Sequence, residues 1–364
     1  MNRIAYKAQR LFTGEEWKDD HAVVVEDGVV VEVLPFSDVR GIEVKDAGDV
    51  MAPAFIDLQI YGANKKLLAE YPSPDALQDL VDYCRDGGAV LCLPTLATNT
   101  REVFFRAIDA VRAYWKQGGK GVPGLHLEGP WINPVKRGAH VEELIHSPEI
   151  EEVRELLEYG RGAIQMITLA PEVCSSEVIR LIQSYNIILS AGHSNCSYEE
   201  AVKSFGEGIG AVTHLYNAMS PLQHREPGLV GATLHHGSVR ASIIADGHHV
   251  RYEAVAIAKR IMGSRLFAIT DAVTETVSGA YRHEPEGDKY VCNGTLSGSA
   301  LTMHKAFMNL VRFAGINEDE ALRMCSLYPA QVARLEGYGK IAPGSAAEFV
   351  VMNNGLELTG VISG

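Results

Sequence analysis

The sequence predicts an α/β protein, a TIM-type (β/α)8 barrel with a small β-sandwich domain formed from both ends of the chain. Eight short apolar runs alternate with segments of helical periodicity, as expected for βα units around a parallel sheet. Strand-like runs also lie at both termini. A chain of 364 residues has room for a barrel of about 250 residues and a smaller domain beside it.

The two ends of the chain have the residue pattern of a β-sheet. Residues 21–35, HAVVVEDGVVVEVLP, place two β-branched runs around an Asp-Gly pair, which is typical of a β-hairpin. Residues 339–354, GKIAPGSAAEFVVMNN, have a Pro-Gly turn signal before an apolar run. We therefore predict one β-sandwich domain over residues 1–50 and 338–364, and the barrel over residues 51–337.

The middle of the chain contains the eight predicted barrel strands. They cover residues 50–60, 88–96, 122–129, 164–171, 186–193, 211–217, 239–247 and 266–272. The segments between them, such as 74–88 and 101–119, place apolar residues at i, i+3 and i+4 and end in Gly, as helices do. A doubly wound sheet is the alternative, but the GxGxxG turn typical of that fold is missing after the first run.

Composition narrows the class of protein. The net charge is −13, from 33 Lys and Arg against 46 Asp and Glu, which argues against a nucleic-acid partner. Because the N-terminus lacks an apolar signal region and no run reaches about 18 apolar residues, we expect a cytoplasmic protein without a membrane span. Six scattered cysteines without a CxxC pair indicate reduced thiols rather than disulfides or a thiolate metal site.

Acidic and imidazole side chains lie where several predicted strands end. Glu128 ends the third run, His193 ends the fifth, His214 lies in the sixth and Asp271 in the eighth. In a barrel these ends meet at one mouth, where the active site forms. A lone histidine is more often structural, but a His2Glu set with an open position is a recognised catalytic metal pattern. We therefore predict one divalent ion bound by Glu128, His193 and His214.

The roles of four further residues stay open at this level. Asp271 follows an apolar run, where it is either a helix cap or salt-bridge partner, or, beside a metal site, the general base that we favour. Arg225 and His249 on loops either bind a phosphate or carboxylate or are solvated charges. His140 in a Gly-containing loop either polarises a substrate carbonyl or is exposed.

Seven segments together carry a resemblance to a known family. They are HLEGPWINPVKRGAH, SAGHSN, VTHLYNAM, REPGLVGA, ADGHHV, ITDA and LSGSALTM. In this order they resemble the amidohydrolase superfamily and, within it, the N-acetylglucosamine-6-phosphate deacetylase family. The resemblance spans nearly the whole chain and implies a barrel with a small β-sandwich domain. It implies hydrolysis of the acetamide of N-acetyl-D-glucosamine 6-phosphate to glucosamine 6-phosphate and acetate, in amino-sugar catabolism.

The resemblance also implies roles for individual residues. The metal would be a single zinc or iron ion on Glu128, His193 and His214, with Asp271 as general base and then acid and His140 polarising the acetamide carbonyl. The sugar phosphate would contact Asn217, Ala218, Arg225 and His249. Met303 would line the sugar pocket. Arg225 and His249 are the candidates for donation from a neighbouring subunit, which implies a homodimer.

The first predicted strand departs from the two-metal members of the superfamily. Those carry His-x-His there, whereas this chain has Gln59, Ile60 and Tyr61, and amides and phenols are poor substitutes for imidazole ligands. Gln59 therefore marks a vestigial metal position and indicates a one-metal enzyme. A second departure lies at Val273–His283, a region that caps the substrate pocket in relatives.

Other functions compete with this interpretation. The same ligands could serve another N-acyl sugar phosphate, such as N-acetylgalactosamine 6-phosphate, or a cyclic amide or nucleobase deaminase. Deaminases generally need ligands on the first strand, which disfavours them here. A metal-free, inactive assembly protein is the non-enzymatic alternative, since fold alone does not establish activity. The presence of Glu128, His193, His214 and Asp271 together disfavours that alternative.

Overall fold

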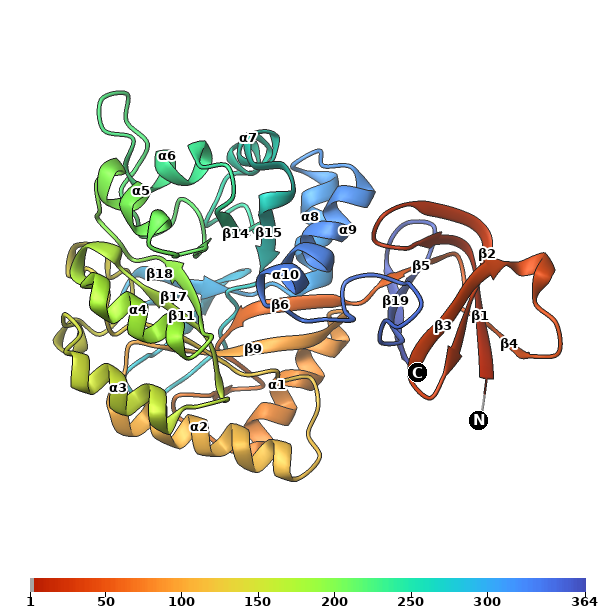
Figure 1. The fold of residues 1–364 in the computed structure, drawn as a ribbon, viewed down its shortest axis with the longest axis horizontal. Helices are drawn as coiled ribbons and strands as arrows, with labels where there is room; N and C mark the ends of the chain where they lie inside the picture. The colour runs from red at the N-terminus through yellow and green to blue at the C-terminus, as the bar shows by residue number, and fades with distance from the viewer. Residues whose placement is uncertain (1–2) are drawn as a thin grey trace.

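The computed structural model describes residues 3–364 and has two parts, a large barrel and a smaller β-sheet beside it (Figure 1). The chain starts in the small sheet, enters the barrel through β6, and returns to the small sheet after α10 (Figure 1). This arrangement confirms the predicted fold class. The proposed domain limits at residues 51 and 337 stay a prediction.

The barrel is a ring of eight parallel strands in which each strand pairs with the next one along the chain. Each of the eight predicted runs overlaps one of them, and β9 extends one residue past its run. The strands are β6 (Phe55–Ile60), β9 (Ala89–Ala97), β10 (Leu125–Glu128), β11 (Ile164–Leu169), β12 (Ile188–Ala191), β13 (Ala211–Val212), β14 (Arg240–Ile244) and β15 (Leu266–Ile269).

The ring closes between β15 and β6, through residues just past the strands. The Asp271 N–H donates to the Gln59 carbonyl at 3.0 Å, and the Tyr61 N–H donates to the Ala272 carbonyl at 2.9 Å. Closure therefore places Gln59, Tyr61 and Asp271 side by side at the mouth of the barrel.

Helices cover the outside of the barrel (Figure 1). They are α1 (Pro74–Asp86), α2 (Arg101–Lys116), α3 (Ile150–Tyr159), α4 (Ser176–Ser184), α5 (Tyr198–Gly206), α6 (Gly228–His235), α7 (Tyr252–Met262), α8 (Met303–Arg312), α9 (Glu318–Cys325) and α10 (Leu327–Val332). The helices predicted at 74–88 and 101–119 are confirmed. α1 begins after Ser73, whose side chain accepts the Ala76 N–H at 3.2 Å, the expected N-cap chemistry.

Strands from both ends of the chain form one sheet, in the order β20-β19-β5-β1-β2-β3, with β4 paired to β1. They are β1 (Arg3–Phe12), β2 (Trp17–Glu26), β3 (Val29–Pro35), β4 (Glu43–Asp46), β5 (Val50–Pro53), β19 (Glu348–Met352) and β20 (Leu358–Ser363). The predicted hairpin is confirmed: Asp27 and Gly28 both have positive φ, 49° and 78°, as its tight turn requires. The predicted run 50–60 divides, because β5 joins this sheet and β6 joins the barrel.

A small antiparallel sheet that the sequence pattern did not indicate lies next to the mouth. It consists of β16 (Glu284–Glu286), β17 (Lys289–Cys292) and β18 (Thr295–Ser299), and a second short pair is β7 (Gly62–Ala63) with β8 (Lys66–Leu67). The Val273 N–H donates to the Ser299 carbonyl at 3.2 Å, which fixes β18 against the segment after Asp271. The region Val273–His283, the second departure noted in the sequence, thus lies between the barrel and this sheet.

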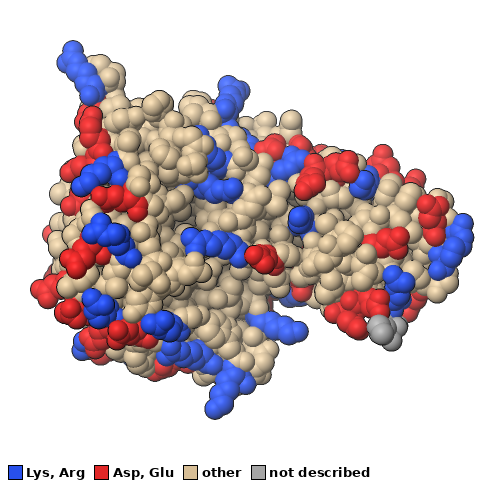
Figure 2. All heavy atoms as spheres, viewed as in Figure 1, with Lys and Arg blue, Asp and Glu red and all other residues tan. Residues whose placement is uncertain are grey.

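The surface carries charges of both signs. On the face in Figure 2, Lys and Arg alternate with Asp and Glu over both parts of the molecule. Among the described residues, no helix is long and apolar enough to cross a membrane.

Candidate active site

A chamber of about 300 Å³ opens at the mouth of the barrel. Its walls contain Glu128 from the end of β10, His193 after β12, His214 after β13 and Asp271 after β15. The structure therefore brings together the four residues that the strand ends predicted. All four side chains are buried, which keeps their mutual charges unscreened.

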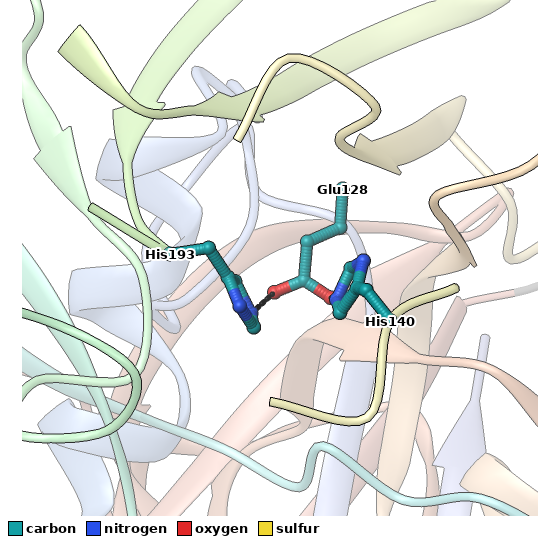
Figure 3. A group of neighbouring side chains, drawn as sticks. All are labelled: Glu128, His140 and His193. Carbon is teal, nitrogen blue, oxygen red and sulfur yellow. Dashed lines mark ion pairs between the residues drawn. The ribbon is translucent and has the colours of Figure 1, made fainter. Parts of the chain in front are cut away.

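Glu128 is the centre of the cluster. Its Oε1 lies 2.9 Å from His214 Nε2 and 3.2 Å from His193 Nε2, and the two imidazole nitrogens lie 3.1 Å from each other. Its Oε2 lies 3.4 Å from His140 Nε2. Figure 3 shows the rings of His193 and His140 on opposite sides of the Glu128 carboxylate.

Burial would raise the pKa of Glu128, but the hydrogen bonds and charge of His193, His140 and His214 outweigh burial and hold that pKa well below its usual range. Glu128 is therefore an anion in this site. An anionic oxygen beside two imidazole nitrogens is the donor set that a divalent transition-metal ion prefers.

The hydrogen-bond partner of each histidine Nδ1 shows which ring nitrogen carries the proton, and so whether the ring can act as a ligand or as a donor. His193 Nδ1 lies 2.9 Å from the Lys136 carbonyl, which can only accept, so the proton of the neutral ring is on Nδ1 and Nε2 carries a lone pair into the site. This is the tautomer of a metal-ligating histidine. His214 Nδ1 is buried without a partner among the described residues, and burial lowers the pKa of that ring.

His140 has the opposite tautomer. Its Nδ1 accepts the Thr98 N–H at 3.2 Å and lies 2.8 Å from Thr98 Oγ1, so the neutral ring carries its proton on Nε2. Burial and the neighbouring His193 lower the pKa of His140 to about 4, so the ring is neutral at pH 7. Glu128, His140 and His193 offer ligand atoms within 4.8 Å of one another, but the tautomer makes His140 a donor rather than a ligand.

The geometry of the remaining three ligand atoms fits a metal ion. Atoms bound tetrahedrally at about 2.1 Å from an ion lie about 3.4 Å apart, and the three atoms here are separated by 2.9 to 3.2 Å. Glu128, His193 and His214 therefore form a suitable site for one divalent ion.

Gln59 and Tyr61 occupy the space beside Glu128. Gln59 Nε2 lies 2.8 Å from Tyr61 Oη, 3.1 Å from Glu128 Oε1 and 2.8 Å from Asp271 Oδ1. Tyr61 donates its hydroxyl proton to Glu128 Oε2. An amide N–H group thus joins two carboxylates at the end of the first barrel strand.

Asp271 faces the cluster from the end of β15. Burial raises its pKa well above the usual range, and the negative charges of Glu128, Asp246 and Asp57 raise it further. Its Oδ2 lies 4.0 Å from His249 Nε2, whose Nδ1 is hydrogen-bonded to Asp246 at 2.6 Å. A buried carboxyl group with a raised pKa is suited to proton transfer.

The predicted substrate contacts are only partly brought to the chamber. Asn217, Ala218 and His249 line it. Arg225 is exposed on the loop between β13 and α6, which projects from the barrel (Figure 1). Met303, the first residue of α8, is buried in the core and does not line the chamber.

Three residues of the site were not singled out as functional from the sequence. Lys136 lines the chamber, and its carbonyl is hydrogen-bonded to the His193 ring. The Thr98 N–H donates to the His140 ring, and the Tyr61 hydroxyl donates to the Glu128 carboxylate. Thr98 and Tyr61 follow β9 and β6 directly, so the rule that strand ends form the site could have found them. Lys136 lies in a loop, where no comparable signal exists.

Comparisons with known proteins agree with this geometry. The amidohydrolase family matches residues 50–364. An Escherichia coli protein named N-acetylgalactosamine-6-phosphate deacetylase is 32% identical over 367 residues, covering 97% of this chain and 96% of its own. The N-acetylglucosamine-6-phosphate deacetylase of Haemophilus influenzae is 31% identical, with coverage of 97% and 96%.

Solved structures lead to the same family. The N-acetylglucosamine-6-phosphate deacetylase of Pasteurella multocida superposes with a TM-score of 0.94 at 32% identity, covering 99% of this chain and 98% of its own. An aspartate-to-alanine variant of the Mycobacterium smegmatis enzyme, in complex with N-acetyl-D-glucosamine-6-phosphate, superposes with a TM-score of 0.93 at 25% identity, with coverage of 100% and 98%. The chain therefore belongs to the amidohydrolase family, and the relatives named here are deacetylases of N-acetylated amino-sugar 6-phosphates.

Proposed function

We propose that the chain hydrolyses the acetamide of N-acetyl-D-glucosamine 6-phosphate to glucosamine 6-phosphate and acetate, in amino-sugar catabolism and in the cytoplasm. The observation that carries the proposal is the convergence of Glu128, His193 and His214 beside a donor, His140, and a carboxyl group, Asp271, in one chamber. Relatives that match almost the whole chain carry this activity in their names.

Glu128, His193 and His214 would hold one divalent ion, for which zinc and iron are the candidates. A bound ion of this kind lowers the pKa of water to about 7 and stabilises negative charge that develops on a carbonyl oxygen. Gln59 and Tyr61 keep the Glu128 carboxylate in place through their hydrogen bonds. Their role is to orient the ligand.

Asp271 and His140 would divide the remaining work. Asp271 takes the proton from the attacking water and returns it to the leaving nitrogen, which becomes the free amine. The Nε2–H of His140 donates to the acetamide oxygen as it gains charge, and the Thr98 N–H keeps the ring in the tautomer that can donate. The raised pKa of Asp271 favours the return of the proton in the second step.

The phosphate would lie toward Lys136, Asn217, Ala218 and His249, on the open side of the chamber. Among the described lining residues, Lys136 is the one with a permanent positive charge. A single positive charge does not neutralise a phosphate dianion. We therefore propose a homodimer in which Arg225, exposed on its projecting loop, reaches the chamber of a second subunit. A bidentate Arg would complete the phosphate site.

N-acetylgalactosamine 6-phosphate is the second candidate substrate. The Escherichia coli relative at 32% identity is named for that substrate, and the two sugars differ only in the configuration at carbon 4. The acetamide chemistry is the same for both, so the ligand set does not distinguish them.

The decisive experiment measures acetate release from both sugar phosphates before and after chelation, with the metal content of the same sample. We expect release from at least the glucosamine derivative, its loss with the metal, and recovery when zinc or iron is returned. Undiminished activity in metal-free protein would contradict the assigned ligand set. No release from either sugar by metal-loaded protein would contradict the proposed function.

A further inference from the structure

The segment Val273–His283 is a loop with an exposed tip and a buried end. Val277 at the tip is 84% exposed, whereas Tyr281 is 3% exposed. Thr276 closes the loop, because its hydroxyl donates to the Tyr281 carbonyl at 2.5 Å. The closed loop therefore holds the Tyr281 side chain inside the protein, next to the ring of His140.

Tyr281 contacts both His140 and the residue that holds His140. Its ring packs edge-on against the His140 ring, with 6.4 Å between the ring centroids and 87° between the ring planes. Its hydroxyl donates to the Thr98 carbonyl at 2.5 Å. The N–H and the hydroxyl oxygen of Thr98 lie 3.2 and 2.8 Å from His140 Nδ1. Thr98 thus connects the Tyr281 hydroxyl with the ring of His140.

The direction of the hydrogen bond from Tyr281 is fixed. A carbonyl oxygen can only accept, so the phenol donates. Burial raises the pKa of Tyr281 above its usual value and outweighs the opposing effect of a hydrogen bond from the Val141 N–H, so the phenol keeps its proton at neutral pH. Val141 follows His140 in the chain. The hydroxyl therefore holds the backbone at Thr98 and the backbone beside His140.

The position of Thr98 decides which ring nitrogen of His140 carries the proton. A hydroxyl can accept as well as donate, so the Thr98 hydroxyl alone would allow a proton on Nδ1, whereas the Thr98 N–H does not. With the proton on Nδ1, the Nε2 atom could not donate to a substrate oxygen. Thr98 lies one residue past β9, where the pairing of that strand with β10 has ended, so its carbonyl needs a partner from elsewhere.

We propose that Tyr281 is a positioning residue for His140: by donating to the Thr98 carbonyl, it keeps the Thr98 N–H on His140 Nδ1 and the proton on Nε2. This inference rests on the proposed deacetylase function, in which Nε2 donates to the acetamide oxygen. Tyr281 does not line the chamber, so it acts through His140 without touching the substrate. The proposal also gives a role to the segment Val273–His283.

The experiment compares Tyr281→Phe with the unmodified enzyme, both loaded with zinc, on N-acetyl-D-glucosamine 6-phosphate. Phenylalanine keeps the edge-on packing and removes only the hydroxyl. We expect kcat to fall about 10- to 100-fold with KM and zinc content unchanged, because the lost interaction acts on the transition state. A kcat within about twofold of the unmodified enzyme would overturn the inference and leave the proposed function intact. A fall in zinc content would also overturn it, because Tyr281 would then support the whole site.

A double-mutant cycle separates positioning of His140 from a general structural role. His140→Ala should itself lower kcat about 10²- to 10³-fold, the loss usual for a donor to an oxyanion. If Tyr281 acts through His140, adding Tyr281→Phe to His140→Ala should cost nothing further, because the group that it positions is gone. The same fold-loss from Tyr281→Phe in both backgrounds would overturn the inference.

Tyr114→Phe controls for the loss of a buried phenol hydroxyl. Tyr114 is also 3% exposed and donates to a backbone carbonyl, that of Lys120, at 2.7 Å. This variant should leave kcat unchanged, and a loss equal to that of Tyr281→Phe would overturn the inference. No hydrolysis by the unmodified, zinc-loaded enzyme would overturn both the inference and the proposed function.

Discussion

Replacing Tyr61 by Phe tests whether the metal ligand depends on its neighbour. The substitution removes one buried hydroxyl, which donates to Glu128 Oε2 and accepts from Gln59 Nε2 at 2.8 Å. Burial raises the pKa of Tyr61 well above its usual value, and the charges of Glu128 and Asp271 raise it further, so the phenol is a proton donor throughout the working pH range. Without it, Oε2 retains only His140 Nε2, at 3.4 Å.

A hydrogen bond to a charged group contributes about 1.5 to 3 kcal/mol, equivalent to about 10- to 150-fold in a binding constant. We therefore expect Tyr61→Phe to weaken zinc binding about 10- to 100-fold, the range usual for groups that orient a ligand. Competition with a chromophoric chelator measures the affinity, and kcat/KM at saturating zinc shows whether chemistry is affected as well.

The matched control is Tyr114→Phe. Tyr114 is 3% exposed and donates its hydroxyl proton to the Lys120 carbonyl at 2.7 Å, away from the mouth on α2. This variant loses the same atom and should keep wild-type zinc affinity. If Tyr61→Phe bound zinc within about twofold of wild type, the hydroxyl would not orient Glu128 and the reasoning would be refuted.

Three further predictions follow from the same geometry. Asp271→Asn should lower kcat about 10²- to 10⁴-fold with unchanged metal content, and near-normal turnover would remove Asp271 from the role of base. Arg225→Ala should raise KM for the phosphorylated sugar while barely changing the slow hydrolysis of unphosphorylated N-acetylglucosamine; equal losses on both would argue against a phosphate contact. Burial lowers the pKa of His126 from 6.5 to about 4, so the unfolded chain binds more protons between these values and stability is lost as the pH falls through that window. The wild-type free energy of unfolding, measured by urea titration, should fall between pH 6.5 and pH 5, and His126→Asn should make that fall smaller by about 2 kcal/mol. The same dependence of unfolding free energy on pH in both proteins would contradict the lowered pKa of His126.

The sequence predicted the barrel because apolar periodicity is a local signal. All eight strands and the hairpin at Asp27 and Gly28 follow from short-range patterns of β-branched residues and turn residues. The division of residues 50–60 between two sheets could not be predicted, because both halves are fully buried and differ in their partners, which are β1 and β19 for β5 and β9 for β6. The strands at 284–299 are short, and their buried and exposed residues do not alternate, so they lack the pattern that marks a half-buried strand.

The site was predictable to the extent that barrel topology brings strand ends together. Glu128, His193, His214 and Asp271 meet because each terminates a strand of the same ring. The distinction between ligand and donor was beyond the residue pattern, since it depends on which backbone group faces Nδ1 of each ring. A carbonyl faces His193 and an N–H faces His140, and both come from segments distant in the chain, at Lys136 and Thr98.

Backbone conformation gives an independent reason to regard these side chains as functional. His193, His214 and Asp271 all have positive φ, at 48°, 37° and 54°, a region that costs non-glycine residues about 1 kcal/mol or more. A glycine at each position would relieve that cost, so a fold under selection for stability alone would have little reason to keep two imidazoles and a carboxyl group there. The strain is concentrated at the mouth, where the side chains converge on one chamber. Their convergence, rather than the stability of the barrel, therefore accounts for the residues found at these strand ends.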